Sequence, residues 1–194
     1  MRRRATVFLL GALCLVAASA APALAQSRQY VQGQVIGIGG RRAGLNRPFS
    51  LTVNNYTSPD DVQQLNRALS SGGQDELLRV LSKLDAGRVS VGNNVGVRAN
   101  AVIATPTAEG GTKLTVLYER NVAIFELRYG ARSADYRFGY AEIYLDARGR
   151  GQGTFIPAAK VKLEGDNNWV VEDFGEFPAR LMGLRSTGRV GGVR

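Results

Sequence analysis

Two glutamates, Glu126 and Glu142, are the residues whose type and setting best suit catalysis in this sequence. Each lies within an alternating apolar and polar stretch, and Tyr140 and Tyr144 flank Glu142 on its side of an extended chain. An apolar, aromatic setting raises the pKa of a carboxyl group, and two carboxyl groups facing one cleft can act on a glycosidic bond. The sequence therefore offers Glu126 and Glu142 as candidates for a carboxylate-based hydrolase. The alternative is that both lie on solvent-facing strand positions beside neighbouring arginines.

The same stretch also suits ligand binding without catalysis. In an extended chain, Tyr140, Glu142 and Tyr144 point to one side, and small or aliphatic residues at 141, 143 and 145 point to the other. The aliphatic side is the natural core face, so the aromatic and acidic side is predicted to line either a pocket inside a barrel or an exposed sheet surface. Tyrosine rings stack on ligands, and a carboxylate orients them by hydrogen bonding. Tyr140, Glu142 and Tyr144 are therefore the predicted ligand-binding residues.

Composition excludes most other catalytic chemistry. The chain has no histidine, and its one cysteine, Cys14, lies in the apolar N-terminal stretch. Ser–His–Asp and Cys–His machinery is therefore absent, and so are the imidazole and thiolate ligands that zinc prefers. The glycine-rich segment 149–153 precedes a predicted strand and lacks the lysine of a phosphate-binding loop, so it is predicted to be a hairpin turn. We expect no metal and no cofactor.

Residues 1–25 have the three parts of a secretory signal peptide. Three arginines at positions 2–4 precede an apolar run over residues 7–18, and the Ala-x-Ala site ends at Ala25. We expect cleavage after Ala25 and export, so that the protein is secreted or periplasmic. No second apolar run is long enough to cross a bilayer, so no transmembrane span is expected after cleavage.

The charge balance bears on partners. The chain has 25 Lys and Arg against 16 Asp and Glu, and only three of the basic residues fall in the leader. A basic exported protein can contact anionic envelope polymers, and the other interpretation is a solvated surface rich in arginine. Nucleic acid is not an expected partner, because the protein is exported and strand aromatics are expected to pack. The sequence leaves the partner open between a small ligand and an anionic envelope polymer.

Most of the chain after the leader alternates with the two-residue period of β-strands. Four such segments follow one another over residues 137–146, 151–164, 168–173 and 177–185, separated by short breaks rich in Gly, Asn and Asp. Pro157 predicts an edge or a bulge in the second of them. Earlier strands are predicted over residues 26–40, 49–54, 89–91, 95–103, 113–118 and 122–129. Breaks this short favour antiparallel neighbours, because a parallel crossover needs about a dozen residues or more.

Residues 58–85 are predicted to form a helical hairpin. Ser58 suits the N-cap and Pro59 the first helical position, and Gly72 with Gly73 interrupts the pattern. A wide leucine stripe follows the break and includes Leu78 and Leu81. We expect this stripe to pack against the sheet.

The chain resembles a family of signal-peptide-bearing bacterial proteins with no assigned function. The likeness is one of pattern and order, and it spans residues 49–185. The segments that carry it are 72–78, 135–138, 142–146, 149–153, 157–160 and 178–181. The resemblance implies a secreted single domain and brings no activity, cofactor or catalytic residue with it.

The predicted fold is α+β: a mostly antiparallel, curled sheet, either barrel or sandwich, with the helical hairpin packed against it. Up-and-down strand order favours the barrel. The predicted organisation is a signal peptide over 1–25, one β-rich domain over 26–185 and a disordered tail over 186–194. The predicted function is non-enzymatic binding in the envelope or outside the cell. A hydrolase using Glu126 or Glu142 is the first alternative, and an envelope-associated structural module with an arginine surface is the second.

Overall fold

The computed structural model describes residues 28–40, 43–121, 132–165 and 168–188. Two of the sequence predictions, the signal peptide and the strand over residues 122–129, lie outside these ranges. The elements in chain order are β1 (Gln29–Gly37), β2 (Asn46–Val53), α1 (Pro59–Leu81), β3 (Gly87–Val91), β4 (Val97–Ala99), β5 (Ala101–Pro106), β6 (Thr112–Glu119), the 3-10 turn η2 (Arg132–Asp135), β7 (Phe138–Leu145), β8 (Arg150–Glu164), β9 (Asn168–Phe174) and β10 (Ala179–Thr187).

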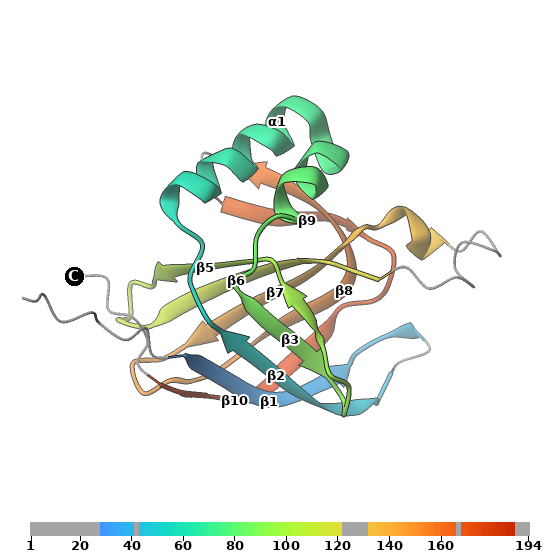
Figure 1. The fold of residues 1–194 in the computed structure, drawn as a ribbon. Coiled ribbons are helices and arrows are strands. Elements are labelled where there is room, and N and C mark those ends of the chain that lie inside the picture. The colour runs from blue at the N-terminus through green and yellow to red at the C-terminus, as the bar shows by residue number, and fades with distance from the viewer. Residues whose placement is uncertain (1–27, 41–42, 122–131, 166–167, 189–194) are drawn as a thin grey trace, which may run out of the picture.

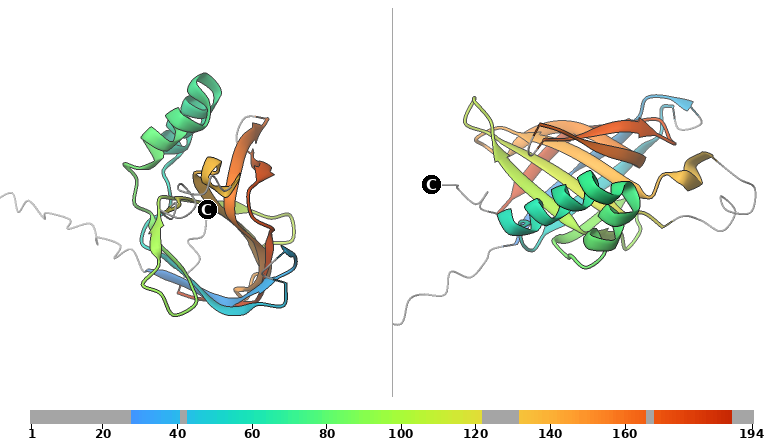
Figure 2. Two further views of the ribbon diagram at one scale, coloured as in Figure 1. Left: turned by 90° about the vertical axis from the view of Figure 1, so that its right-hand side faces the viewer. Right: turned by 90° about the horizontal axis from the view of Figure 1, so that it is seen from above.

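The strands form one antiparallel sheet that curls into a nearly closed barrel (Figures 1 and 2). The strand order is β4-β3-β2-β1-β10-β8-β7-β6-β5, with β9 added beside β8. The two ends of this order, β4 and β5, are consecutive in the chain and only Asn100 separates them. The predicted antiparallel, curled sheet is therefore confirmed, and its form is an up-and-down barrel.

Asn100 forms the corner at which the barrel closes. Its buried side-chain amide donates hydrogen bonds of 3.2 Å to the carbonyl oxygens of Leu81, the last residue of α1, and of Leu84 just beyond it. Its side-chain oxygen accepts a 2.9 Å bond from the backbone of Glu119 on β6. The single strand predicted over residues 95–103 is therefore wrong. The chain turns at Asn100, so that β4 pairs with β3 and β5 pairs with β6.

The helix packs on the outside of the barrel, over the face that includes β6, β7 and β8 (Figure 1). The Ser58 side chain accepts a 3.1 Å hydrogen bond from the backbone of Asp61, as expected for an N-cap. The helical path breaks at Gly73, whose φ of 64° is in the region that favours glycine. The predicted helical hairpin is thus present as two helical segments that meet at the kink at Gly73, and the second segment ends at Leu81 rather than near residue 85. Leu65, Leu77 and Leu81 are fully buried beneath it.

The hairpin of β8 and β9 extends past the barrel and supports the helix. Strand β8 stops pairing with β10 before Pro157 and pairs with β9 from Ala159 onward. The irregularity predicted at Pro157 is present as a register shift between β8 and β7. The indole N–H of Trp169 on β9 donates a 2.6 Å hydrogen bond to Asn66 on α1. The side-chain amide of Gln74 bonds to both backbone groups of Val161. Two polar contacts therefore fix the helix over its apolar cluster.

Candidate functional site

The three predicted ligand-binding residues lie on the outer face of the barrel. Ala141, Ile143 and Leu145 point inward and are buried, as the alternation predicts. Tyr140 is also buried, because α1 and β9 cover that end of the outer face, whereas Tyr144 is 45% exposed. Tyr140, Glu142 and Tyr144 therefore belong to the sheet surface and not to the barrel interior.

Glu142 is held by three donors on this surface. Tyr140 donates to Oε2 at 3.0 Å, Tyr144 donates to Oε1 at 2.5 Å, and the Lys113 ammonium lies 2.9 Å from Oε2. Partial burial by itself would raise the pKa of the Glu142 carboxyl, but the three hydrogen bonds outweigh it and lower that pKa below its ordinary value. The bond to the carboxylate raises the pKa of Tyr144 to about 12. A carboxylate stabilised in this way is a poor general acid.

The other catalytic candidate, Glu126, lies outside the described residues, so its position relative to Glu142 is not part of the described site. Tyr144 lines a shallow cavity of about 510 Å³ together with Thr107, Asp146 and Gln152. Neither Tyr140 nor Glu142 lines it. Ligand binding on the outer face therefore stays a prediction. Its residues include one exposed ring, that of Tyr144, and one ion-paired carboxylate, that of Glu142.

A larger cavity, of about 610 Å³, opens at one end of the barrel. This end, which we call the mouth, lies where β3 and β6 end, where β4 begins and where β8 passes from β10 to β9. The cavity lining combines aliphatic and aromatic side chains with five polar or charged ones. Its lining residues are Val89, Ser90, Val91, Asn94, Val95, Gly96, Val97, Tyr118, Arg120, Asn121, Phe155, Pro157 and Glu176.

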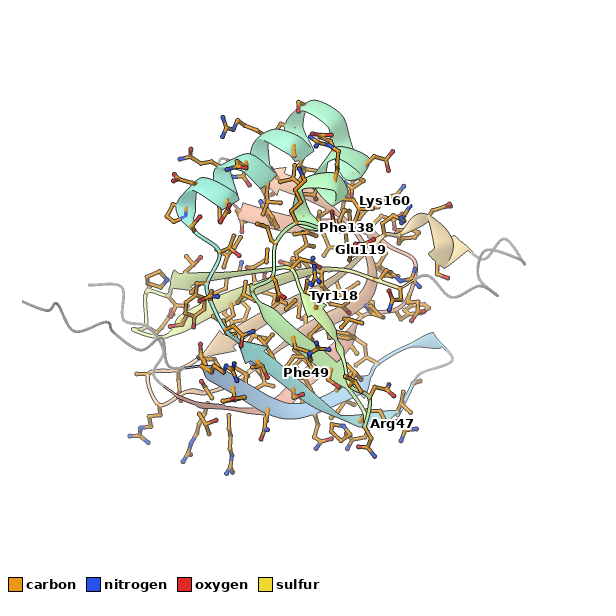
Figure 3. All side chains as sticks on the ribbon, in the orientation of Figure 1. Arg47, Phe49, Tyr118, Glu119, Phe138 and Lys160 are labelled. Carbon is orange, nitrogen blue, oxygen red and sulfur yellow. The ribbon has the colours of Figure 1, made fainter. Side chains whose placement is uncertain are left out.

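Aromatic rings form the floor of the mouth cavity. Tyr118 stacks on Phe155 with ring centroids 6.5 Å apart and an interplanar angle of 18°. Phe49 meets Phe155 edge to face at 6.2 Å. Tyr118 and Phe49 both lie within the curl of the sheet in Figure 3, whereas Phe138 lies toward the helix. The floor thus presents apolar, aromatic surface to whatever occupies the cavity.

Gly139 makes room for the Tyr118 ring. The two residues are directly opposite on β7 and β6. A Cβ at position 139 would lie 1.9 Å from Cζ and 2.3 Å from the hydroxyl oxygen of Tyr118. No side chain larger than hydrogen fits there unless the ring moves. The position of the cavity floor therefore depends on a glycine in the facing strand.

Arg120 and Glu176 bring charge to a cavity whose other lining side chains are uncharged. Arg120 is partly buried, and its Nη1 donates to the carbonyl oxygens of Ser133 at 2.5 Å and Tyr136 at 3.0 Å. These bonds hold the guanidinium group against the turn η2. Glu176 is also partly buried and reaches the cavity from the segment between β9 and β10. A few polar groups at the edge of an apolar cavity are typical of sites that fix the orientation of a ligand.

Exposed apolar side chains gather around the mouth. Val95 is 84% exposed in the β3–β4 connection and Phe177 is 59% exposed between β9 and β10. Leu45 and Phe177 also line a small cavity that shares Phe155 and Pro157 with the main one. The apolar lining therefore continues onto part of the rim.

Buried side chains also pack at the opposite end of the barrel. Gln29 is buried there, donates a 2.8 Å hydrogen bond to Ser186, and accepts one from the hydroxyl of Tyr56. Burial raises the pKa of Tyr56. Leu184 and Leu145 pack in the same interior cluster. These side chains therefore pack together in the described part of the opposite end.

The mouth residues Tyr118, Phe155, Arg120 and Glu176 are not among the site residues predicted from the sequence. Alternation in β6 does place Tyr118 on the same face as Leu114 and Val116, which was the available signal. Tyr118 and Arg120 are two residues apart, but Phe155 and Glu176 come from β8 and from the segment between β9 and β10, so it is the folding of the sheet that brings the four together.

No model of a known family, no curated protein and no solved structure matches this chain. The resemblance to a signal-peptide-bearing bacterial family therefore stays a prediction. Within the described ranges, no three Asp, Glu, Cys or His side chains come close enough together to hold a metal ion. The helices in those ranges include none with both the length and the hydropathy that spanning a bilayer requires.

Proposed function

We propose that the protein is a non-enzymatic binding protein that holds a small, mainly apolar molecule in the mouth of its barrel. The observation that carries this proposal is the cavity of about 610 Å³ with its aromatic floor. Ligand sites occupy roughly 300–1,000 Å³ and combine apolar walls with a small number of oriented polar groups. The mouth has both properties, whereas the outer-face cluster around Glu142 has a carboxylate already bonded to three donors.

The lining defines the chemistry of the ligand. Tyr118 and Phe155 favour a flat or ring-containing apolar body, which stacks on them. Arg120 favours an anionic or hydrogen-bond-accepting group at the edge of the cavity, and the nearby Glu176 carboxylate favours a hydrogen-bond donor. An amphiphilic ring compound with one polar end satisfies these requirements.

The proposed setting is outside the cytoplasm. The arginine-rich start, apolar run and Ala-x-Ala site of residues 1–25 support export and a secreted or periplasmic mature chain. The carboxylate hydrolase remains the alternative function, with Glu142 or Glu126 as its acid. The lowered pKa of the Glu142 carboxyl is the observation that makes us prefer binding over catalysis at that residue.

Fluorescent apolar probes test the proposed function. N-phenyl-1-naphthylamine is neutral and 1-anilinonaphthalene-8-sulfonate is anionic, and both brighten when they leave water. Val97→Phe adds a ring inside the cavity, whereas Thr154→Phe adds the same ring on the exposed outer face of β8. We expect Val97→Phe to weaken probe binding about tenfold or more, and Thr154→Phe to leave it unchanged. Equal affinities in the two variants would refute binding at the mouth.

Two further variants separate ligand orientation from catalysis. Arg120→Gln should lower the affinity for the anionic probe more than that for the neutral probe, because only the anionic probe loses a charge partner. Glu142→Gln should leave both affinities unchanged. If the protein is a hydrolase, it should turn over some substrate in a panel of polysaccharides and metabolites. That turnover should disappear in Glu142→Gln, since general acid–base catalysis contributes about 10²–10⁴-fold.

A further inference from the structure

Among the described residues, the outward strand positions on the face opposite the helix carry arginines and no carboxylate. This face consists of outward positions on β8, β10, β1, β2, β3 and β4, and we call it the arginine face. Figure 3 shows long side chains with nitrogen tips projecting from the β1 and β10 part of this face. Its principal residues are Tyr30, Gln32, Gln34, Ser50, Thr52, Arg88, Arg98, Arg150, Gln152, Thr154, Arg180, Met182 and Arg185. Among the described residues, no Asp or Glu occupies an outward position on β10, β1, β2, β3 or β4. The same holds for β8 between residues 150 and 154.

Arginines occur in directly opposed pairs at both sides of this face. Arg150 on β8 is opposite Arg185 on β10, and Arg88 on β3 is opposite Arg98 on β4. Like charges directly opposite each other destabilise a sheet. All four residues are exposed, so the barrel core does not require arginine at any of them. Two such pairs on one face indicate that the positive charge serves an anionic partner.

The first pair is available to such a partner. Within the described part of the chain, the guanidinium groups of Arg150 and Arg185 form no ion pair, and neither does that of Arg180. The second pair is partly engaged: Arg98 lies 3.6 Å from the Asp85 carboxylate, and Arg88 donates to the carbonyl oxygen of Gly96 at 3.2 Å.

Hydrogen-bonding side chains lie between the two arginine pairs. One row across the strands runs Arg150, Arg185, Gln32, Ser50 and Ser90, and its neighbour runs Thr187, Tyr30, Thr52, Arg88 and Arg98. Because neighbouring strands are about 4.8 Å apart, the centres of the two pairs are separated by about 19 Å along the curved sheet. A chain-like molecule that crosses the strands would meet charge at each end and amide or hydroxyl groups between.

We propose that the arginine face binds an acidic polysaccharide. Its carboxylate or sulfate groups pair with the arginines, and its hydroxyl groups bond to Gln32, Ser50 and Thr52. A bilayer would need several apolar side chains to insert, and a single nucleic acid strand would need several stacking rings. Tyr30 and Met182 are the large exposed apolar residues that the described strands place on this face. The inference is independent of the mouth cavity, which faces a different direction and is lined by different residues.

Affinity chromatography and titration with alginate, an acidic polysaccharide, test this proposal, with neutral dextran as the uncharged comparison. The purified protein should bind alginate and not dextran, and binding should weaken as salt increases. The double variant Arg150→Gln/Arg185→Gln should lose about tenfold in affinity. The control Arg67→Gln/Lys83→Gln removes the same charge from exposed positions on or beside α1 and should retain the affinity.

Stability and competing polyanions complete the test. Replacing both opposed arginines removes their repulsion, so Arg150→Gln/Arg185→Gln should have a raised or unchanged melting temperature. A melting temperature measured in that range shows that a loss of alginate binding in this variant is not due to unfolding. Equal loss in both double variants would overturn the proposal, since net charge alone would then explain binding. Tighter binding to phosphatidylglycerol vesicles or to single-stranded DNA than to alginate would also overturn it. Loss of naphthylamine binding at the mouth would have no bearing on these outcomes.

Discussion

A double-mutant cycle on Gly139 and Tyr118 tests the structure of the cavity floor. In the native barrel, a Cβ at position 139 would lie 1.9 Å from the Tyr118 ring, so Gly139→Ala must displace that ring from its stack on Phe155. Overpacking of this kind costs about 1–3 kcal/mol. When the ring is absent, as in Tyr118→Ala, the nearest obstacle is removed. Gly139→Ala should then stabilise the protein by about 0.4–1 kcal/mol, because alanine restricts the unfolded chain.

The sign of the Gly139→Ala effect should therefore reverse between the two backgrounds, with a coupling energy of about 1.4–4 kcal/mol. Urea unfolding of the four proteins measures it, and Tyr118→Leu can replace Tyr118→Ala if the latter leaves too little folded protein. Gly153→Ala is the control, because its Cβ would lie 2.2 Å from the backbone oxygen of Glu142 and not near Tyr118. Its cost should be the same in both backgrounds. An equal cost of Gly139→Ala with and without the Tyr118 ring would refute the placement of that ring.

Three further predictions concern the helix, the outer-face carboxylate and the leader. Leu81→Ala should destabilise the protein by about 2–5 kcal/mol, because the Leu81 side chain of α1 is fully buried. Leu78→Ala should cost less, because Leu78 is only partly buried. Costs near zero for both variants in urea unfolding would contradict the packing of the helix on the sheet. The lowered pKa of the Glu142 carboxyl means that its contribution to stability is complete above the unfolded-state value of about 4.3 and is lost as pH falls through the lowered folded-state value. Urea midpoints between pH 6 and pH 3 should therefore fall further in the wild type than in Glu142→Gln, and parallel curves would show that the carboxylate is not stabilised. Mass spectrometry of the exported protein should find Gln26 as the first residue, whereas an intact N-terminus on a membrane-bound form would show that the leader is retained.

The local structure was largely readable from the sequence because it depends on local patterns. The alternation in β7 separated Ala141, Ile143 and Leu145 from Tyr140, Glu142 and Tyr144, and the barrel has them on opposite faces. Ser58 and Pro59 marked the start of α1, and Gly73 marked its bend. Strand ends were less exact: β10 begins at Ala179 and continues to Thr187, into the predicted tail.

The long-range structure was not readable because no local pattern encodes it. Asn100 lies inside an alternating stretch, and nothing nearby in the sequence indicates that its amide will bond to the end of α1. Nor does the sequence indicate that the chain turns at Asn100, from β4, which pairs with β3, to β5, which pairs with β6. The mouth cavity depends on that closure, since Val97 on β4 and Tyr118 on β6 line it together with Phe155 on β8. The sequence pattern therefore favoured Tyr140, Glu142 and Tyr144, because they are neighbours on one face of a single strand and are adjacent whether or not the barrel closes.

The most direct test of the proposed function is to locate a bound probe at residue resolution. Backbone and side-chain NMR shifts of the protein titrated with N-phenyl-1-naphthylamine should change most at Tyr118, Phe155 and Val97 around the mouth cavity. Largest changes at Tyr144 and Glu142 on the outer face, with none at the mouth, would contradict the proposal and favour the site that the sequence predicted.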